Sequence, residues 1–131
     1  MSQTYPSYAA LLLRVSTGIL FVAHGLLKLM VFTPAGTADY FKSLGLPGPL
    51  AYAVMALEIL GGLALILGFQ TRWLSIAFAL ELLGAAIFGH AANGWMFANT
   101  GGGWEFPVFW AAVMIALALL GDGAYAMRQK Q

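Results

Sequence analysis

The stretch that decides the fold is residues 9–31, AALLLRVSTGILFVAHGLLKLMV, an apolar run interrupted by Arg14, His24 and Lys28. It is long enough for a membrane span, because a helix needs about 20 apolar residues to cross a bilayer. Comparable runs follow at residues 50–69, 73–92 and 104–127. The sequence therefore predicts an all-α integral membrane protein, a four-helix transmembrane bundle forming a single domain over residues 1–131.

The composition supports a membrane assignment. Of the 131 residues, 61% are hydrophobic and only 8% are charged, whereas a soluble domain carries about 25% charged residues. The net charge of +1 offers no electrostatic basis for binding nucleic acid. The absence of cysteine excludes disulfides, thiolate catalysis and iron–sulfur ligation. Any redox chemistry must therefore use a cofactor or a substrate.

Two further segments have a predicted role. The start of the chain lacks a basic region of the kind that precedes a signal peptide, so we expect residues 9–31 to stay as an anchor. Residues 33–49 predict a short helix at the membrane surface, with Thr37 as its N-cap and Gly45 as its stop.

The basic residues predict the orientation of the bundle. Cytoplasmic ends of membrane helices carry an excess of Lys and Arg. With four spans, one side would hold four basic residues and the other side two: Arg14, Arg72, Arg128 and Lys130 against Lys28 and Lys42. We therefore expect both termini in the cytoplasm.

The depths of the ionisable residues predict which of them meet. Such groups are costly inside a membrane unless they pair, face the bundle interior or reach an interface. Counting about 1.5 Å per helical residue from the cytoplasmic side matches four pairs in depth: Arg14 with Asp122, His24 with Glu81, Lys28 with Glu58, and His90 with Glu105.

These pairs do not all predict the same role. Arg14 and Asp122 lie near the inner surface, where an ion pair most often fixes helix register, so we interpret them as a structural ion pair. Lys28–Glu58 and His90–Glu105 fit either a structural or a functional role. His24 with Glu81 favours function, because a carboxylate near mid-membrane rarely lacks a task and histidine titrates near neutral pH.

The sequence argues against a haem or metal site. His24 and His90 differ in depth by about 12 Å, which is too far for the two axial ligands of one haem. The Glu-x-x-His motifs of carboxylate-bridged metal sites are missing from the sequence, and no flavin motif is seen. We therefore expect no haem, flavin or metal.

A series of motifs resembles the DoxX family of small membrane proteins. The order of the motifs carries the resemblance, which extends over about residues 10 to 124. They are Arg14, His24-Gly25-x-x-Lys28, Ser43-Leu44-Gly45-Leu46-Pro47, Glu58-x-x-Gly61-Gly62, Gly68-x-x-Thr71-Arg72, His90, and Gly102-Gly103-x-Glu105-x-Pro107.

The resemblance implies a multi-pass protein of the bacterial or archaeal cytoplasmic membrane. Relatives are described as subunits of quinol oxidases or of thiosulfate:quinone oxidoreductases, and others are linked to quinone detoxification. The family pattern includes most of the polar residues above, whereas Glu81 rests on the depth count alone. The first hypothesis is thus a redox subunit that binds a quinone between its helices through His24, Lys28, Glu58, Glu81, His90 and Glu105.

Two other hypotheses stay open. The chain could be a non-catalytic accessory or assembly subunit whose polar pairs only hold its helices. It could also carry protons or a small solute along His24 and Glu81. The redox hypothesis requires an electron-donating partner protein or substrate, and membrane lipid and a homo-oligomer are the other expected partners.

Overall fold

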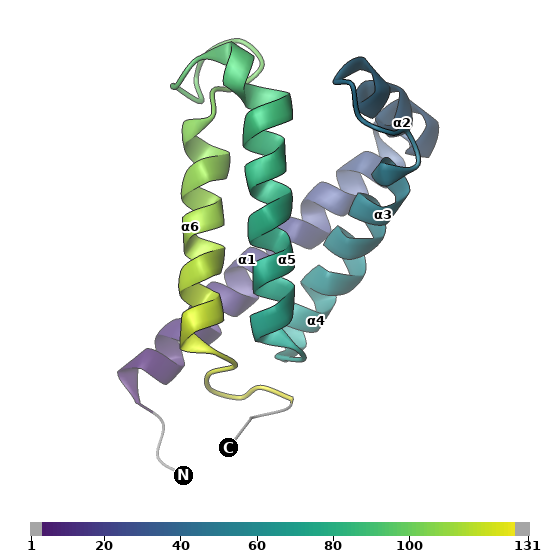
Figure 1. Ribbon diagram of the computed structural model, residues 1–131. Helices are drawn as coiled ribbons and strands as arrows, with labels where there is room; N and C mark the ends of the chain where they lie inside the picture. Colours follow the sequence, from purple (N-terminus) through teal and green to yellow (C-terminus); the bar gives the residue numbers. More distant parts are fainter. Residues whose placement is uncertain (1–3, 128–131) are drawn as a thin grey trace. The chain divides into compact units, whose positions relative to one another are not determined.

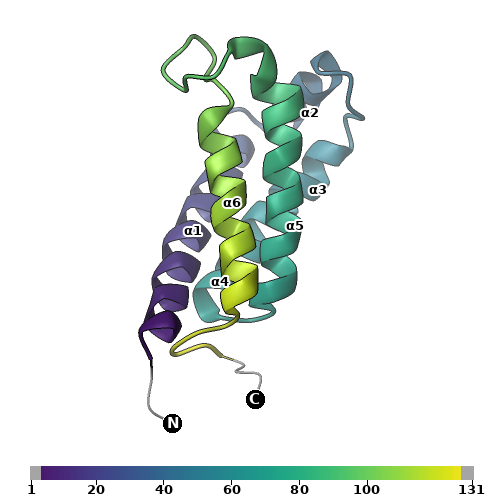
Figure 2. The same ribbon diagram turned by 60° about the vertical axis from the view of Figure 1, so that its left-hand side comes forward.

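A computed structural model describes residues 4–127 of the chain, and in this range all regular structure is helical. The all-α class is therefore confirmed. The described residues divide into two units. The first comprises residues 4–71 and 122–127, and the second comprises residues 72–121. Figures 1 and 2 show the course of the helices from the purple N-terminal end to the yellow C-terminal end.

The first unit begins with α1, Tyr5–Met30, which starts earlier than the predicted residue 9. Thr4 is the N-cap, since its hydroxyl accepts a hydrogen bond from the Ser7 N–H at 3.4 Å. Pro6 stands in the first turn, where its missing N–H costs no helical hydrogen bond. These capping residues extend the helix by one turn beyond the apolar run.

The short helix after α1 is found, but its predicted N-cap is wrong. Helix α2 runs Pro34–Ser43, and the hydroxyl of Thr33 accepts from the Gly36 N–H at 3.1 Å. Thr33 followed by proline starts the helix one turn before the predicted cap. Thr37 is buried inside α2, and its hydroxyl donates to the carbonyls of Thr33 and Lys28 at 2.8 and 3.2 Å.

The second apolar run forms one continuous helical stretch of three segments. Helix α3, Leu50–Ala56, passes into the π-helix η1, Leu57–Gly61, and then into α4, Gly62–Leu67. The stretch ends at Leu67, and the next residue, Gly68, has φ +81°, a left-handed conformation that glycine adopts without steric cost. The observed end lies two residues before the predicted residue 69.

Glycines bring α1 close to this stretch. A Cβ added to Gly18 would lie 2.7 Å from the carbonyl oxygen of Gly62, and one added to Gly62 would lie 2.8 Å from that of Gly18. Both distances are shorter than real contacts, so the two backbones meet where neither residue has a side chain. Small residues at helix interfaces allow such close approach in membranes.

The second unit is built around two antiparallel helical stretches that lie side by side in both views (Figures 1 and 2). One stretch consists of α5, Thr71–Gly84, the π-helix η2, Ala85–His90, and the 3-10 turn η3, Ala91–Asn93. The other is α6, Glu105–Leu120. A loop of residues 94–104 joins them.

The predicted end of the last helix at residue 127 is wrong, because α6 stops at Leu120. Gly121 and Gly123 have φ values of +85° and +76° and turn the chain away from the helix. Residues 122–127 then belong to the first unit. There the Ala124 N–H donates to the Ser7 carbonyl at 3.0 Å, and the Met127 N–H donates to the Leu67 carbonyl at 2.8 Å.

Within residues 4–127, three helical stretches are long and apolar enough to cross a membrane: Tyr5–Met30, Leu50–Leu67 and Thr71–Asn93. Helix α6 is apolar but has only 16 residues, about 24 Å against a hydrocarbon core of about 30 Å. The multi-pass character is supported, whereas a fourth span and the cytoplasmic termini stay predictions. Arg128 and Lys130, used for the orientation, lie outside the described residues.

Candidate functional site

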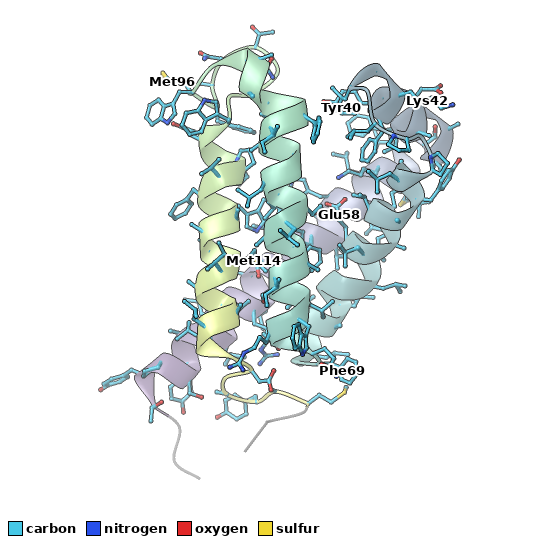
Figure 3. All side chains as sticks on the ribbon, viewed as in Figure 1. Tyr40, Lys42, Glu58, Phe69, Met96 and Met114 are labelled. Carbon is cyan, nitrogen blue, oxygen red and sulfur yellow. The ribbon has the colours of Figure 1, made fainter. Side chains whose placement is uncertain are left out.

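The first unit contains a buried ion pair. The Lys28 ammonium lies 2.6 Å from the Glu58 carboxylate, and Glu58 is only 4% exposed. Figure 3 labels Glu58 on the stretch that joins α3 to α4. The two residues that the depth count placed at one level therefore meet, from α1 and from η1.

Local backbone structure explains how the pair forms. Glu58 lies in the π-helix η1, and such wide turns are frequent at functional sites. One turn before Lys28, Gly25 of α1 packs closely against η1. A Cβ added there would lie 2.6 Å from Cγ1 of Ile59 and 3.1 Å from Cβ of Glu58. The missing side chain of Gly25 thus lets Lys28 reach Glu58 across a narrow interface.

His24 is the third titratable residue near this pair. Its Nδ1 lies 2.7 Å from the Leu20 carbonyl, which fixes the ring against its own helix. His24 lies one turn before Lys28 on α1. Its predicted partner Glu81 lies on α5, in the second unit. The His24–Glu81 pair therefore stays a prediction.

Arg14 is completely buried and binds backbone carbonyls. Its Nη1 donates to Leu65 and Ile66 at 3.1 and 2.8 Å, and its Nη2 donates to Ala124 at 2.7 Å. The first two carbonyls belong to the last turn of α4, the negative end of the helix dipole, where a cation is favoured. Arg14 thus holds residues 122–127 against the end of α4. In the described part of the chain, no ion pair within 4 Å joins Arg14 to Asp122, the partner predicted from depth.

The second unit contains a groove of about 650 Å³ at the loop end of α6. We call it the aromatic groove because aromatic side chains dominate its lining. It is lined by Trp95, Phe97, Trp104, Glu105, Phe106, Val108, Phe109 and Ala112. Glu105, the first residue of α6, is the only ionisable residue of this lining.

The loop that forms this groove is ordered by backbone hydrogen bonds. The Gly103 N–H donates to the Met96 carbonyl, and the Trp104 N–H donates to the Gly94 carbonyl, both at 3.0 Å. Figure 3 labels Met96 in this loop. The Glu105 N–H donates to the Trp95 carbonyl at 3.1 Å. These bonds hold the aromatic side chains at fixed positions along the loop.

His90, the last residue of η2, connects this loop to α5. Its Nδ1 lies 2.9 Å from the Gly102 carbonyl, which also accepts from the Asn93 amide at 2.9 Å. Because a carbonyl only accepts, Nδ1 carries the proton, and Nε2 is the acceptor atom of the neutral ring. Within the described residues, no ion pair within 4 Å joins His90 to Glu105.

A row of rings leads from His90 into the aromatic groove. The ring centroids of His90 and Phe97 are 6.0 Å apart, and those of Phe97 and Phe106 are 5.2 Å apart. Phe106 and the buried Trp110 follow at 5.7 Å. These tilted rings lie within the distance range of favourable aromatic pairs.

The sequence-based site lacked the groove's aromatic residues. Trp95, Phe97, Trp104 and Phe106 lie close together in the sequence, a pattern that is also typical of a membrane boundary, where Trp and Tyr gather. Aromatic residues on both sides of a glycine-rich stretch are the signal that could have identified a groove. Neither of the two π-helices was predicted.

Comparisons with known proteins give a consistent family. The DoxX family model matches residues 9–91. The "Putative oxidoreductase CatD" of Bacillus subtilis is 39% identical over 89% of this chain and 82% of its own length. The "Inner membrane protein YphA" of Escherichia coli is 33% identical over 92% of this chain and 88% of its own length.

A second Escherichia coli relative, the "Inner membrane protein YqjF", is 33% identical over 89% of this chain and 87% of its own length. No solved structure matches the chain.

Proposed function

The chain belongs to the DoxX family of membrane proteins, and we propose that it serves as a membrane subunit of a quinone-linked redox system. In this proposal the quinone-like ligand places its ring in the aromatic groove. The name of the Bacillus subtilis relative, an oxidoreductase, supports a redox role. The names of the two Escherichia coli relatives support a bacterial cytoplasmic membrane location.

The aromatic groove is the observation that carries the proposal. Its volume of about 650 Å³ lies within the range of about 300–1,000 Å³ of small-molecule sites. Such sites are mostly apolar and aromatic, with few polar groups. The lining combines five Trp and Phe side chains with a single carboxylate. A flat ring with an oxygen at its edge fits this chemistry.

A quinone would supply redox chemistry that the side chains lack, since it takes up two electrons and two protons. The chain's own residues would bind the ring and handle protons. Trp95, Trp104 and Phe106 would contact the ring through their faces and edges. The Glu105 carboxylate could accept a proton at the ring's edge, and Nε2 of His90 is a second acceptor.

The proposal includes the polar residues outside the groove. His24, Lys28, Glu58 and Glu81 are proposed to carry protons or to orient donors, as the depth count suggested. We propose that electrons come from a partner protein or from a substrate. The four-span topology with α6 as the short last span is part of the proposal.

A crosslinking experiment tests the groove. The protein in liposomes is illuminated with an azido-substituted short-chain ubiquinone analogue, and the adducts are mapped by mass spectrometry. We expect adducts within residues 94–112, suppressed by the same analogue without the azide. Phe106→Ala should weaken this labelling, whereas Phe88→Ala, a change outside the groove, should not. Adducts spread along all helices, or adducts without competition, would contradict the proposal.

One observation favours the accessory-subunit hypothesis as a second candidate. Arg14 donates its hydrogen bonds to backbone carbonyls of the first unit. This charged residue therefore stabilises the fold. If the other polar residues do the same, gentle purification should yield phospholipid and no quinone. Copurified quinone would exclude this candidate.

A further inference from the structure

A second groove of the second unit ends at an arginine. It has a volume of about 380 Å³, and we call it the Arg72 groove. It is lined by Arg72, Ile76, Ala79, Leu80 and Leu83 of α5 and by Ile115, Ala118 and Leu119 of α6. We propose that this groove binds one anionic phospholipid, with an acyl chain along the apolar side chains and the phosphate at the Arg72 guanidinium. This inference is independent of the quinone proposal.

Arg72 is held in a fixed position at the end of the groove. It lies in the first turn of α5, and its Nε donates to the Ala118 carbonyl in the last turn of α6 at 3.1 Å. This bond uses one of the five N–H donors of a guanidinium. The others are on Nη1 and Nη2, and Arg72 is exposed. The charged group is therefore oriented in advance and can still bind an anion.

Gly121 is a neighbour of the Arg72 guanidinium. A Cβ added to Gly121 would lie 3.8 Å from Nη2, an ordinary contact distance, so the missing side chain leaves this side of Nη2 uncovered. The guanidinium fork matches the geometry of a phosphate, to which arginine often donates two parallel hydrogen bonds. A phosphate oxygen is thus a suitable partner for the Nη atoms.

The length of the groove matches one lipid leaflet. From Arg72 to Leu83 the helix rises eleven residues, about 16 Å, and half of the hydrocarbon core is about 15 Å. The wall is apolar and open: Leu80 is 66% exposed and Leu119 is 80% exposed. An acyl chain whose headgroup is at Arg72 would therefore run along the groove toward the bilayer centre.

Charge identifies the occupant as a lipid with a net negative headgroup. Basic residues beside helix grooves near the cytoplasmic side attract anionic headgroups. A zwitterionic headgroup brings its own cation, which reduces the attraction. A second copy of this apolar face would bury the guanidinium without a counter-charge, which is costly. An anionic phospholipid satisfies both the apolar wall and the arginine.

Native mass spectrometry tests the proposal on the whole protein in detergent. The probes are phosphatidylglycerol and phosphatidylcholine with identical acyl chains, titrated separately. We expect a first phosphatidylglycerol to bind about tenfold more tightly than phosphatidylcholine, because the choline cation offsets the attraction between the phosphate and the Arg72 guanidinium. Arg72→Gln should abolish this preference, and the matched control Lys42→Gln, in the first unit, should retain it.

Arg72→Gln also loses the hydrogen bond to the Ala118 carbonyl and could therefore fold less well. A second variant tests the groove without this change. Leu80→Trp places a bulky side chain on an exposed position of the groove and should weaken phosphatidylglycerol binding while the helical circular dichroism stays unchanged. Equal binding of the two lipids by the unmodified protein would overturn the proposal. So would unchanged binding in Leu80→Trp, or a free fatty acid that binds as tightly as phosphatidylglycerol.

Discussion

The two units provide partners for their polar side chains in different ways. In the first unit, Lys28 and Glu58 meet across an interface where Gly25 packs directly against Ile59 and Glu58. In the second unit, His90 bonds to the loop carbonyl of Gly102, and a row of rings leads to the aromatic groove. Close glycine packing suits a charge pair, whereas aromatic packing around an ordered loop leaves room for a ligand.

The largest expected effect comes from removing one partner of the ion pair. Lys28→Met leaves the Glu58 carboxylate buried without its cation, and breaking a buried pair typically costs about 3–5 kcal/mol. Because the Lys28 side chain is 22% exposed, we expect a loss of about 3 kcal/mol in the free energy of unfolding. Reversible unfolding in mixed micelles measures it.

The double variant Lys28→Met with Glu58→Met is the control for this prediction. Replacing both charges by apolar side chains should restore most of the lost stability, since paired removal is often nearly neutral. If the double variant is as unstable as Lys28→Met, the charge pair is not the reason for the loss.

The glycine interface gives the next effect. In Gly25→Val the new side chain meets Ile59 and Glu58, and overpacking typically costs about 1–3 kcal/mol. The matched control is Gly84→Ala on α5, where an added Cβ meets nothing within 4 Å. The unfolding free energy should fall only in the first variant. Equal stability of the two variants would show that α1 and η1 can separate without cost.

A substitution in the aromatic groove should affect the binding of a ubiquinone analogue more than the free energy of unfolding. Trp104→Leu removes an indole from the lining, and we expect about tenfold weaker binding of a ubiquinone analogue, since an aromatic contact contributes about 0.5–1.5 kcal/mol besides its buried area. Trp73→Leu, a change at a 63% exposed residue outside the groove, is the control. Binding can be measured by isothermal titration in nanodiscs. An equal loss in both variants would point to general partitioning into lipid.

The smallest expected effect concerns His90. His90→Phe keeps a ring beside Phe97 but removes the hydrogen bond to Gly102, which should cost about 1 kcal/mol of unfolding free energy. Asn93 still donates to the same carbonyl, so the loop should retain its structure. In the quinone proposal, analogue binding persists and proton-coupled turnover falls. Unchanged turnover would exclude His90 as a proton acceptor.

The regular part of the fold was predictable because apolar runs of spanning length have few alternatives in a membrane protein. The depth count placed Lys28 and Glu58 at one level, because a helix rises by a nearly constant amount per residue, and their contact also required the two side chains to face each other. The two π-helices could not be predicted, because a π-turn reflects packing against neighbours more than local sequence. The glycine contact between Gly18 and Gly62 also depends on helix rotation, which depth does not determine.

The ends of elements were the least predictable. Thr33 and Thr37 are both suitable N-caps by residue type, and Pro34 decides between them by its position in the first turn. At the end of α6, Gly121 and Gly123 stood inside a run that is apolar on average. Hydropathy did not detect their left-handed turn, although two glycines so close together are a typical stop signal.

The Arg14 contact has a consequence for how the chain is made. Ala124, which accepts a hydrogen bond from Arg14, is separated from it by the whole second unit. The first unit is therefore discontinuous in sequence, and the second unit is inserted into it. During synthesis, the Ala124 carbonyl becomes available to Arg14 only after α6 has been made. The first unit can therefore be completed only once translation has passed residue 124.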